Sequence, residues 1–275
     1  MKWIRMKILQ CQTAVSENKQ DNLDRMRACF EEAARRGADL ITFGEMFTCP
    51  YETPRFPLYA EEEGGASFQH FSALAAEYGL LVSAGSIPEK AAAPDGKTAV
   101  YNTAYVFDRK GQMIGKHRKM HLFDIAVRGG QTFRESDTLT AGDQVTVFDT
   151  EFGKMGLCVC FDLRFPGLAM EMVRRGAVVI LVPAAFNQTT GPVHWQLLFR
   201  ARALDGQCFY VGTSPALNPA ASYHAYGHSI VTDPWGSVLS EADEREGLWE
   251  TEIDLDRVRD IREQLPVLCT GGKLG

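Results

Sequence analysis

The chain has 275 residues, of which 45% are hydrophobic and 23% charged, a composition that is typical of globular proteins and excludes a disordered chain. Its formal net charge of −6 at pH 7 disfavours nucleic acid as a partner. No run reaches the ~18 consecutive apolar residues of a membrane-spanning helix, and the first residues lack a signal-peptide pattern, so we expect a cytoplasmic protein with no membrane partner.

In the first half of the chain, apolar periodicity predicts two helices among several strands. The first helix carries apolar residues at helical spacing from Leu23 to Ala33 and is closed by Gly37, and the second is closed by Gly79. Strands are predicted at 4–12, 38–47, 80–88, 101–108 and 112–119. The last two strands are joined by a turn and therefore form a hairpin.

The second half of the chain continues this alternation of helices and strands. Hairpins are predicted over 145–161 and 226–239, with further strands at 177–186, 208–216 and 247–255. Helices are predicted at 164–176, 194–207 and 256–264. Because hairpins interrupt the alternation, we expect an α/β fold with mixed sheets, in which two sheets pack together and helices cover their outer faces. No linker divides the pattern, so residues 1–275 are expected to form one domain.

The chain has seven cysteines with irregular spacing and no CxxC pair, which argues against a disulfide framework and excludes a zinc ribbon. Cys160 stands out because it lies where an apolar strand stops and a helix begins shortly afterwards. This position resembles a nucleophile elbow, in which helix N-terminal amides lower the pKa of a thiol and can bind an oxyanion. The alternative is a small buried hydrophobic residue, which is how we interpret the neighbouring Cys158.

Two further residues have contexts that suit catalysis. Glu45 ends an apolar strand, where burial would raise its pKa and make it a usable base; the alternative is a surface glutamate. Lys119 lies in the basic segment GKHRKMHLFD and either belongs to a solvated loop or points inward as a fixed positive charge. His117 and His121 are four residues apart, as in a helical metal site, but no third ligand is evident, and we expect no metal.

A cysteine can also be activated by a histidine, so a Cys–His hydrolase is a competing interpretation. His121, His194 and His228 are the candidates for that base, and none has a distinguishing context. A third possibility is a binding or scaffold protein that has kept an enzyme fold without its activity.

Three segments together resemble the nitrilase (carbon–nitrogen hydrolase) superfamily: GEMFTCPY with its glutamate, HRKMHLFD with its lysine and GLCVCFDLRFP with its cysteine. The resemblance runs from about residue 6 to about residue 268. It implies a four-layer αββα sandwich with no metal or organic cofactor. It also implies that Glu45 is the general base, Cys160 the nucleophile and Lys119 the stabiliser of the tetrahedral intermediate. Glu135 in TFRES would support the lysine and the substrate, and the Phe161 amide would be the second oxyanion donor.

Within this superfamily, KMHLFDI, TFRESDTLTAGD, AFNQTTGPVHW and SPALNPAASYHAYGHS are most similar to the omega-amidases. That resemblance implies hydrolysis of the terminal amide of 2-oxoglutaramate or 2-oxosuccinamate, with deaminated-glutathione amidase or an N-carbamoyl hydrolase as alternatives. We expect a homodimer or a higher homo-oligomer. Such substrates carry a carboxylate, so we expect Arg164 to bind it, unless Arg164 forms a structural salt bridge. Phe186 and Thr190 are expected to line the same pocket. Gly44 departs from the family, which often has proline there, and we expect it to loosen the turn.

Overall fold

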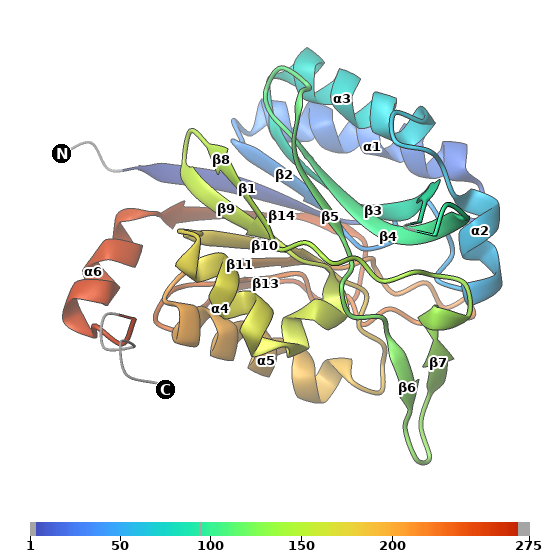
Figure 1. Cartoon of the computed structure of the whole chain (residues 1–275). Coiled ribbons are helices and arrows are strands. Elements are labelled where there is room, and N and C mark those ends of the chain that lie inside the picture. Colours follow the sequence, from blue (N-terminus) through green and yellow to red (C-terminus); the bar gives the residue numbers. More distant parts are fainter. Residues whose placement is uncertain (1–3, 94, 269–275) are drawn as a thin grey trace.

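Two six-stranded sheets form the centre of the protein, and the computed structural model describes them within residues 4–93 and 95–268 (Figure 1). The first sheet has the order β14-β1-β2-β3-β4-β5. Its strands are β14 (Gly247–Asp254), β1 (Arg5–Gln12), β2 (Leu40–Phe43), β3 (Leu81–Ala92), β4 (Thr98–Phe107) and β5 (Met113–Arg118). The second sheet has the order β13-β12-β11-β10-β9-β8. Its strands are β13 (Val238–Glu241), β12 (Ile230–Thr232), β11 (Phe209–Thr213), β10 (Val179–Pro183), β9 (Gly153–Leu157) and β8 (Thr146–Thr150).

Both sheets are mixed, as the hairpins in the sequence predict. In the first sheet β1, β2 and β3 run parallel, whereas β4, β5 and β14 pair antiparallel with their neighbours. In the second sheet β9, β10 and β11 run parallel, and the hairpins add β8, β12 and β13 antiparallel at the two edges. The parallel strands are therefore central in each sheet, where they are buried on both faces.

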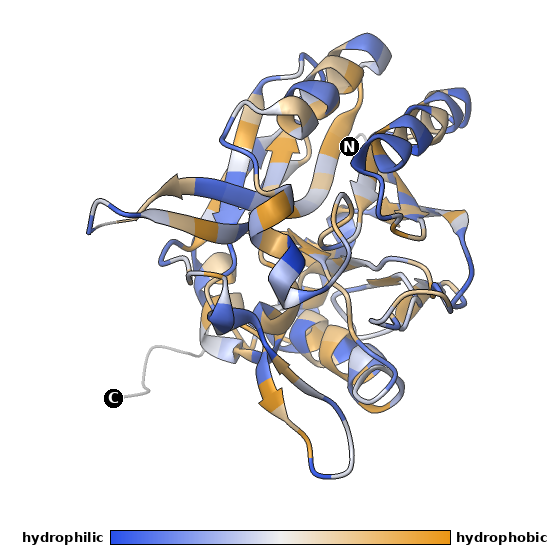
Figure 2. Ribbon diagram, turned by 90° about the vertical axis from the view of Figure 1, so that its right-hand side faces the viewer, coloured by the Kyte–Doolittle hydropathy of each residue, from blue (hydrophilic) through white to orange (hydrophobic). Residues whose placement is uncertain are grey.

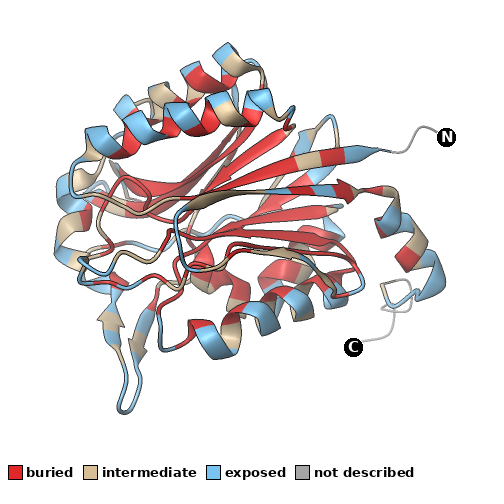
Figure 3. Cartoon of the chain, turned by 180° about the vertical axis from the view of Figure 1, so that it is seen from behind, coloured by how far each residue is buried: buried red, intermediate tan, exposed pale blue. Residues whose placement is uncertain are grey.

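Helices cover the outer face of each sheet, which gives the four layers that the family resemblance implies (Figure 1). The helices α1 (Lys19–Arg35) and α3 (Ala66–Tyr78) pack on the first sheet, and α4 (Pro166–Arg174) and α5 (Gly191–Gly206) pack on the second. Buried residues concentrate on the strands and on the inward sides of these helices (Figure 3). One apolar cluster joins the facing sides of the two sheets, including Ile8 and Leu40 from the first and Leu157 and Ile180 from the second.

A hairpin of β6 (Asp124–Ala126) and β7 (Thr132–Arg134), which the sequence analysis did not predict, extends away from the sheets (Figures 1 and 2). Its strands have three residues each and bury no continuous apolar face, so they leave no periodic pattern in the sequence. The remaining helices are α2 (Phe56–Tyr59) and α6 (Asp256–Gln264). No described helix is both long and apolar enough to cross a membrane.

The strand predicted over 38–47 is wrong in its second half, because β2 ends at Phe43. Gly44 follows, and a Cβ atom there would lie 2.7 Å from the backbone nitrogen of Pro215. The segment after β11 thus packs directly against the Gly44 backbone. The absence of a side chain at Gly44 thus permits a close approach of two chain segments, and the expectation that Gly44 loosens the turn stays a prediction.

Candidate active site

The structure places Cys160 at the predicted junction between a strand and a helix. β9 ends at Leu157, a 3₁₀ helix spans Cys160–Arg164, and α4 begins at Pro166. Cys160 has φ +47°, in the left-handed region that non-glycine residues rarely adopt. Residues held in such conformations cluster at functional sites, and the geometry is that of a nucleophile elbow. The thiol side chain is nearly enclosed, with 4% of the residue exposed.

Glu45, Lys119 and Glu135 form one fully buried cluster, although they are far apart in the sequence. Glu45 follows β2, Lys119 follows β5, and Glu135 begins a short 3₁₀ helix after β7. The Lys119 Nζ atom lies 2.9 Å from Glu45 Oε1 and 2.9 Å from Glu135 Oε2. The structure therefore brings together the residues expected to act as base, cation and support. The Glu45 carboxylate is also near enough to the Cys160 thiol to raise its pKa.

Several further groups hold these two carboxylates, and the sequence analysis did not identify them. The Tyr51 hydroxyl lies 3.1 Å from Glu45 Oε1 and 2.7 Å from Glu135 Oε1. Glu45 also accepts hydrogen bonds from Asn102 Nδ2 at 2.8 Å and from the Ala185 amide at 2.9 Å. Two features of the sequence could have identified these residues. Tyr51 lies in the same GEMFTCPY segment as Glu45, and Asn102 is a polar residue inside an apolar strand.

The charges in this cluster stabilise one another. Burial alone would lower the pKa of Lys119, but the adjacent Glu135 and Glu45 carboxylates outweigh it and raise that pKa, so Lys119 stays protonated. Burial raises the pKa of Glu45 above its usual value, and the Lys119 charge opposes that rise. The direction for Glu45 agrees with the prediction of a base with a raised pKa.

For Cys160 the predicted direction is wrong. Burial, followed by the nearby Glu45 carboxylate, raises the pKa of the thiol well above its usual value, and the Lys119 charge lowers it only in part. The expected lowering by helix amides does not dominate, because the residue is enclosed and faces a carboxylate. The resting state is thus a neutral thiol, which requires a base at the moment of attack. Glu45 is the nearby carboxylate and can accept that proton.

The three residues expected to bind substrate lie together beside the thiol. Arg164, Phe186 and Thr190 line one narrow cavity with Cys160, Phe161, Phe123 and Ala185. The Arg164 guanidinium lies 4.9 Å from the centre of the Phe186 ring and 3.2 Å, through Nη1, from His194 Nδ1. Among the described residues no carboxylate lies within ion-pair distance of Arg164. The alternative of a structural salt bridge is therefore not supported, and burial lowers the pKa of this cation.

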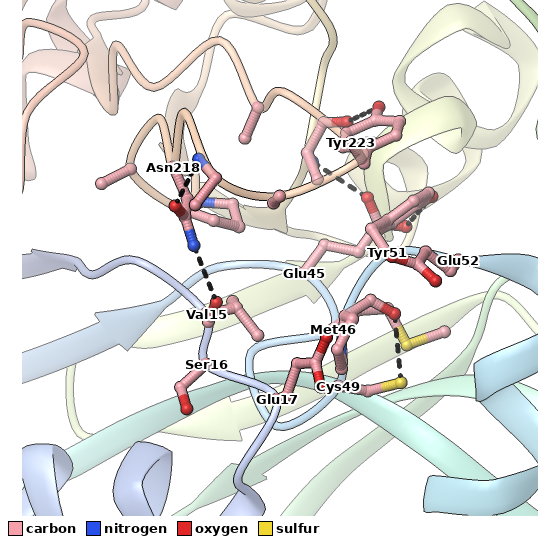
Figure 4. Close-up of a pocket in the computed structure, with 17 residues that line it drawn as sticks. Val15, Ser16, Glu17, Glu45, Met46, Cys49, Tyr51, Glu52, Asn218 and Tyr223 are labelled. Carbon is pink, nitrogen blue, oxygen red and sulfur yellow. Dashed lines mark hydrogen bonds between the residues drawn. The ribbon is translucent and has the colours of Figure 1, made fainter.

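A second cavity, of about 220 Å³, borders Glu45 but not Cys160 (Figure 4). Its lining includes Tyr51 and Tyr223, and it also includes the carboxylate residues Glu17 and Glu52. No Lys, Arg or His is among its lining residues. An anionic substrate is disfavoured in such a pocket, so the cavity at Arg164 is the better candidate for binding a carboxylate.

The candidate histidine bases make other contacts. The His121 ring donates to Asp162 and stacks on Phe165, and the His194 ring contacts Arg164. The His228 ring stacks on a tyrosine. Within the described part of the chain, no histidine ring is hydrogen-bonded to Cys160. The geometry therefore favours Glu45 over a histidine as the base.

The sequence and the structure are similar to those of known proteins. The Carbon-nitrogen hydrolase family profile matches residues 6–263. Omega-amidase NIT2 of Mus musculus is 46% identical over 268 residues, which cover 98% of this chain and 95% of that protein. Omega-amidase NIT2 of Homo sapiens is 44% identical over 263 residues, which cover 96% of this chain and 93% of that protein. The crystal structure of Saccharomyces cerevisiae Nit3, a member of branch 10 of the nitrilase superfamily, superposes with a TM-score of 0.87 at 38% sequence identity. The superposition covers 96% of this chain and 95% of the Nit3 chain.

Proposed function

The chain belongs to the carbon–nitrogen hydrolase family, and we propose that within it the protein is a thiol amidase that releases ammonia from the terminal amide of small 2-oxo acid amides. The observation that carries this proposal is the pairing of two features. The first is a buried Glu45–Lys119–Glu135 cluster. The second is Arg164, a cation without an acidic partner among the described residues, which lines a cavity together with Cys160. The similarity to proteins named omega-amidase supports 2-oxoglutaramate and 2-oxosuccinamate as substrates.

An amide carbonyl is a weak electrophile, so the first step needs both a nucleophile and charge stabilisation. Glu45 takes the thiol proton as the Cys160 sulfur bonds to the carbonyl carbon. The Lys119 ammonium and the Phe161 N–H stabilise the oxygen anion of the tetrahedral intermediate; this N–H lies in the first turn of the 3₁₀ helix, where amides lack acceptors within the helix. Glu45 then passes the proton to the amide nitrogen, the C–N bond breaks, ammonia leaves, and a thioester remains.

Water completes the reaction. Glu45 accepts a proton from a water molecule as the water oxygen attacks the thioester carbonyl, and the same two donors stabilise the second oxyanion. The C–S bond breaks, Cys160 recovers its proton from Glu45, and a carboxylate is released. The net reaction converts one amide and one water into one carboxylate and one ammonia, and the enzyme returns to its starting state.

The residues that line the cavity suit a small substrate with a carboxylate. Phe123, Phe161 and Phe186 provide apolar walls that suit a short methylene chain, and Arg164 can bind the distant carboxylate through two N–H groups. The cavity has no room for a water molecule in this conformation, so a side chain must move when substrate binds. Deaminated glutathione and N-carbamoyl amino acids carry the same combination of amide and carboxylate and are the alternative substrates.

The proposal predicts ammonia release by the purified protein. We expect 2-oxoglutaramate or 2-oxosuccinamate to be the best substrate in a panel that also contains deaminated glutathione, an N-carbamoyl amino acid and a simple nitrile. The Cys160→Ala variant should release none. Ammonia is measured by a coupled assay. No release from any of these compounds by the wild-type protein would reject the amidase function, and a preference for another panel member would change the substrate only.

Arg164 provides a test of the substrate class. Replacing it with alanine should lower kcat/KM for 2-oxoglutaramate by about 10- to 100-fold, because hydrogen bonds to charged groups contribute roughly 1.5–3 kcal/mol. Most of the loss should appear in KM. Activity on a short amide that lacks a carboxylate should change little. The matched control is Arg175→Ala, since Arg175 is an exposed arginine that pairs with Glu171. An unchanged KM in Arg164→Ala would exclude Arg164 as the carboxylate anchor.

A further inference from the structure

Asp162 lies two residues after the nucleophile and is almost completely buried, with 1% exposed. Four hydrogen bonds converge on its carboxylate. Oδ2 accepts from the Val159 amide at 3.0 Å and from His117 Nε2 at 3.0 Å. Oδ1 accepts from the His121 amide at 2.9 Å and from His121 Nδ1 at 2.7 Å. The ring of His121 is further fixed by stacking on Phe165, with 3.5 Å between ring centres.

The residues that donate to Asp162 flank Lys119 and Cys160, which follow strands of different sheets. His117 precedes Lys119 by two residues and His121 follows it by two, so Asp162 holds the chain on both sides of the lysine. Val159 directly precedes Cys160, so the same carboxylate also holds the elbow. An ordinary helix-capping aspartate would need only the Val159 amide. The two histidine rings and the His121 amide require another explanation.

We propose that Asp162 is a positioning residue that sets the distance between the Lys119 ammonium and the Cys160 elbow. The inference deepens the proposed function, because that distance decides whether the lysine reaches the developing oxyanion. A preorganised donor has its full effect only within a few tenths of an ångström of the right place. The carboxylate is suited to the task because it can accept all four hydrogen bonds while remaining ionised.

The hydrogen bonds also explain why the charge persists in a buried place. Burial opposes ionisation of Asp162, but the bonds from His117 and His121 outweigh burial and hold the pKa of the carboxyl well below its usual range. An asparagine at this position has one acceptor oxygen, and its amide N–H groups would face other donors. Asp162→Asn should therefore release at least one side of the Lys119 segment without changing the shape of the residue.

The test compares Asp162→Asn with a matched control, Asp233→Asn. Asp233 is also buried and accepts bonds from the Trp235 and Ser237 amides and from Arg257, in a turn outside the active site. Both variants should lose stability. We expect kcat for ammonia release to fall about 10- to 100-fold in Asp162→Asn with KM within about twofold, and to remain unchanged in Asp233→Asn, because loss of a full oxyanion donor costs about 10²–10³-fold.

A second measurement does not depend on the substrate. The Lys119 charge lowers the pKa of the Cys160 thiol, so a displaced lysine should shift the pH midpoint of Cys160 alkylation by iodoacetamide upward. The shift is read by mass spectrometry in both variants and should occur only in Asp162→Asn. If the wild-type protein releases no ammonia, the proposed function fails while this readout still tests the positioning role.

A milder variant covers the case in which Asp162→Asn does not fold. His121→Phe retains the stacking on Phe165 and removes one donor to Asp162. It should lower kcat several-fold and shift the alkylation midpoint in the same direction. Wild-type kcat and an unshifted midpoint in the folded variants would overturn the proposal, as would a parallel loss of kcat in Asp233→Asn.

Discussion

Replacing Glu45 with glutamine should lower kcat for ammonia release by on the order of 10²–10⁴-fold, because general acid–base catalysis contributes about that much. The structure gives a particular reason for a large effect. Burial and the Glu45 carboxylate raise the pKa of Cys160, so the thiol is neutral at rest and cannot attack without a base. Glutamine keeps the size of the side chain and can still accept from the Ala185 amide, but it cannot take a proton.

The same argument fixes the sign of the pH dependence. Glu45 must be ionised to act, and burial raises its pKa above the usual value. Activity should therefore fall as the pH decreases through that raised pKa, and the acid limb of kcat/KM should lie at a higher pH than the titration of an ordinary glutamate. A wild-type profile with the acid limb at the ordinary value would contradict the raised pKa.

The control for Glu45→Gln is Glu52→Gln. Glu52 lines the second cavity beside Glu45 and hydrogen-bonds Ser222, and it does not contact the thiol. We expect this control to keep wild-type kcat, and circular dichroism should show that both variants are folded. If Glu45→Gln retained more than a tenth of the activity, Glu45 would not be the base. Loss of activity on replacing a histidine would then favour the Cys–His alternative.

The mixed two-sheet fold could be predicted from local patterns in the sequence, whereas the roles of Glu45, Lys119 and Cys160 came from the resemblance to a known family and stay predictions. Apolar runs located the buried strands, and Glu45, Lys119 and Cys160 each lie at or beyond the end of such a run. The partners of these residues could not be found in this way. Asp162 is 45 residues from His117, and no local pattern reports a contact between segments that meet only in the folded protein. The direction of the Cys160 pKa was mispredicted for a related reason, since burial depends on residues far along the chain.

The remaining predictions concern the other cysteines, the oligomeric state and the location of the protein in the cell. Cys269 lies outside the described residues, whereas the other six cysteines are buried and free. Cys158 is part of the central apolar cluster, as expected. The homodimer or higher homo-oligomer and the cytoplasmic location stay predictions.

Replacing Lys119 with methionine should destabilise the protein by about 3–5 kcal/mol at neutral pH, as expected when one partner of a buried ion pair is removed. The lysine is the cation between Glu45 and Glu135, and both carboxylates are fully buried. Methionine has a similar length and packs without charge, so the loss reports mainly the two uncompensated carboxylates. Urea unfolding at several pH values measures it. The control Lys116→Met should lose much less, because Arg118 still pairs with Glu89.

The pH dependence of this loss distinguishes charge from packing. Without Lys119 the pKa of Glu45 must rise further in the folded state, because the lysine charge that lowers it is gone. A group with a raised folded-state pKa contributes stability that is present at low pH and is lost as the pH rises. Lys119→Met should therefore be closest to the wild type at acid pH, where Glu45 is protonated, and furthest from it at alkaline pH, where Glu45 is ionised. A loss independent of pH would mean that the lysine acts through packing alone.

A second substitution separates stability from catalysis at the same place. Adding Glu135→Gln to Lys119→Met removes one of the two carboxylates and should recover part of the lost stability, since only Glu45 then lacks a counter-charge. Ammonia release should not recover, because the oxyanion still lacks its ammonium donor. Recovery of stability and activity together would show that Lys119 supports the fold without contacting the intermediate. Recovery of stability alone is the result expected if one buried cation both balances the cluster and stabilises the transition state.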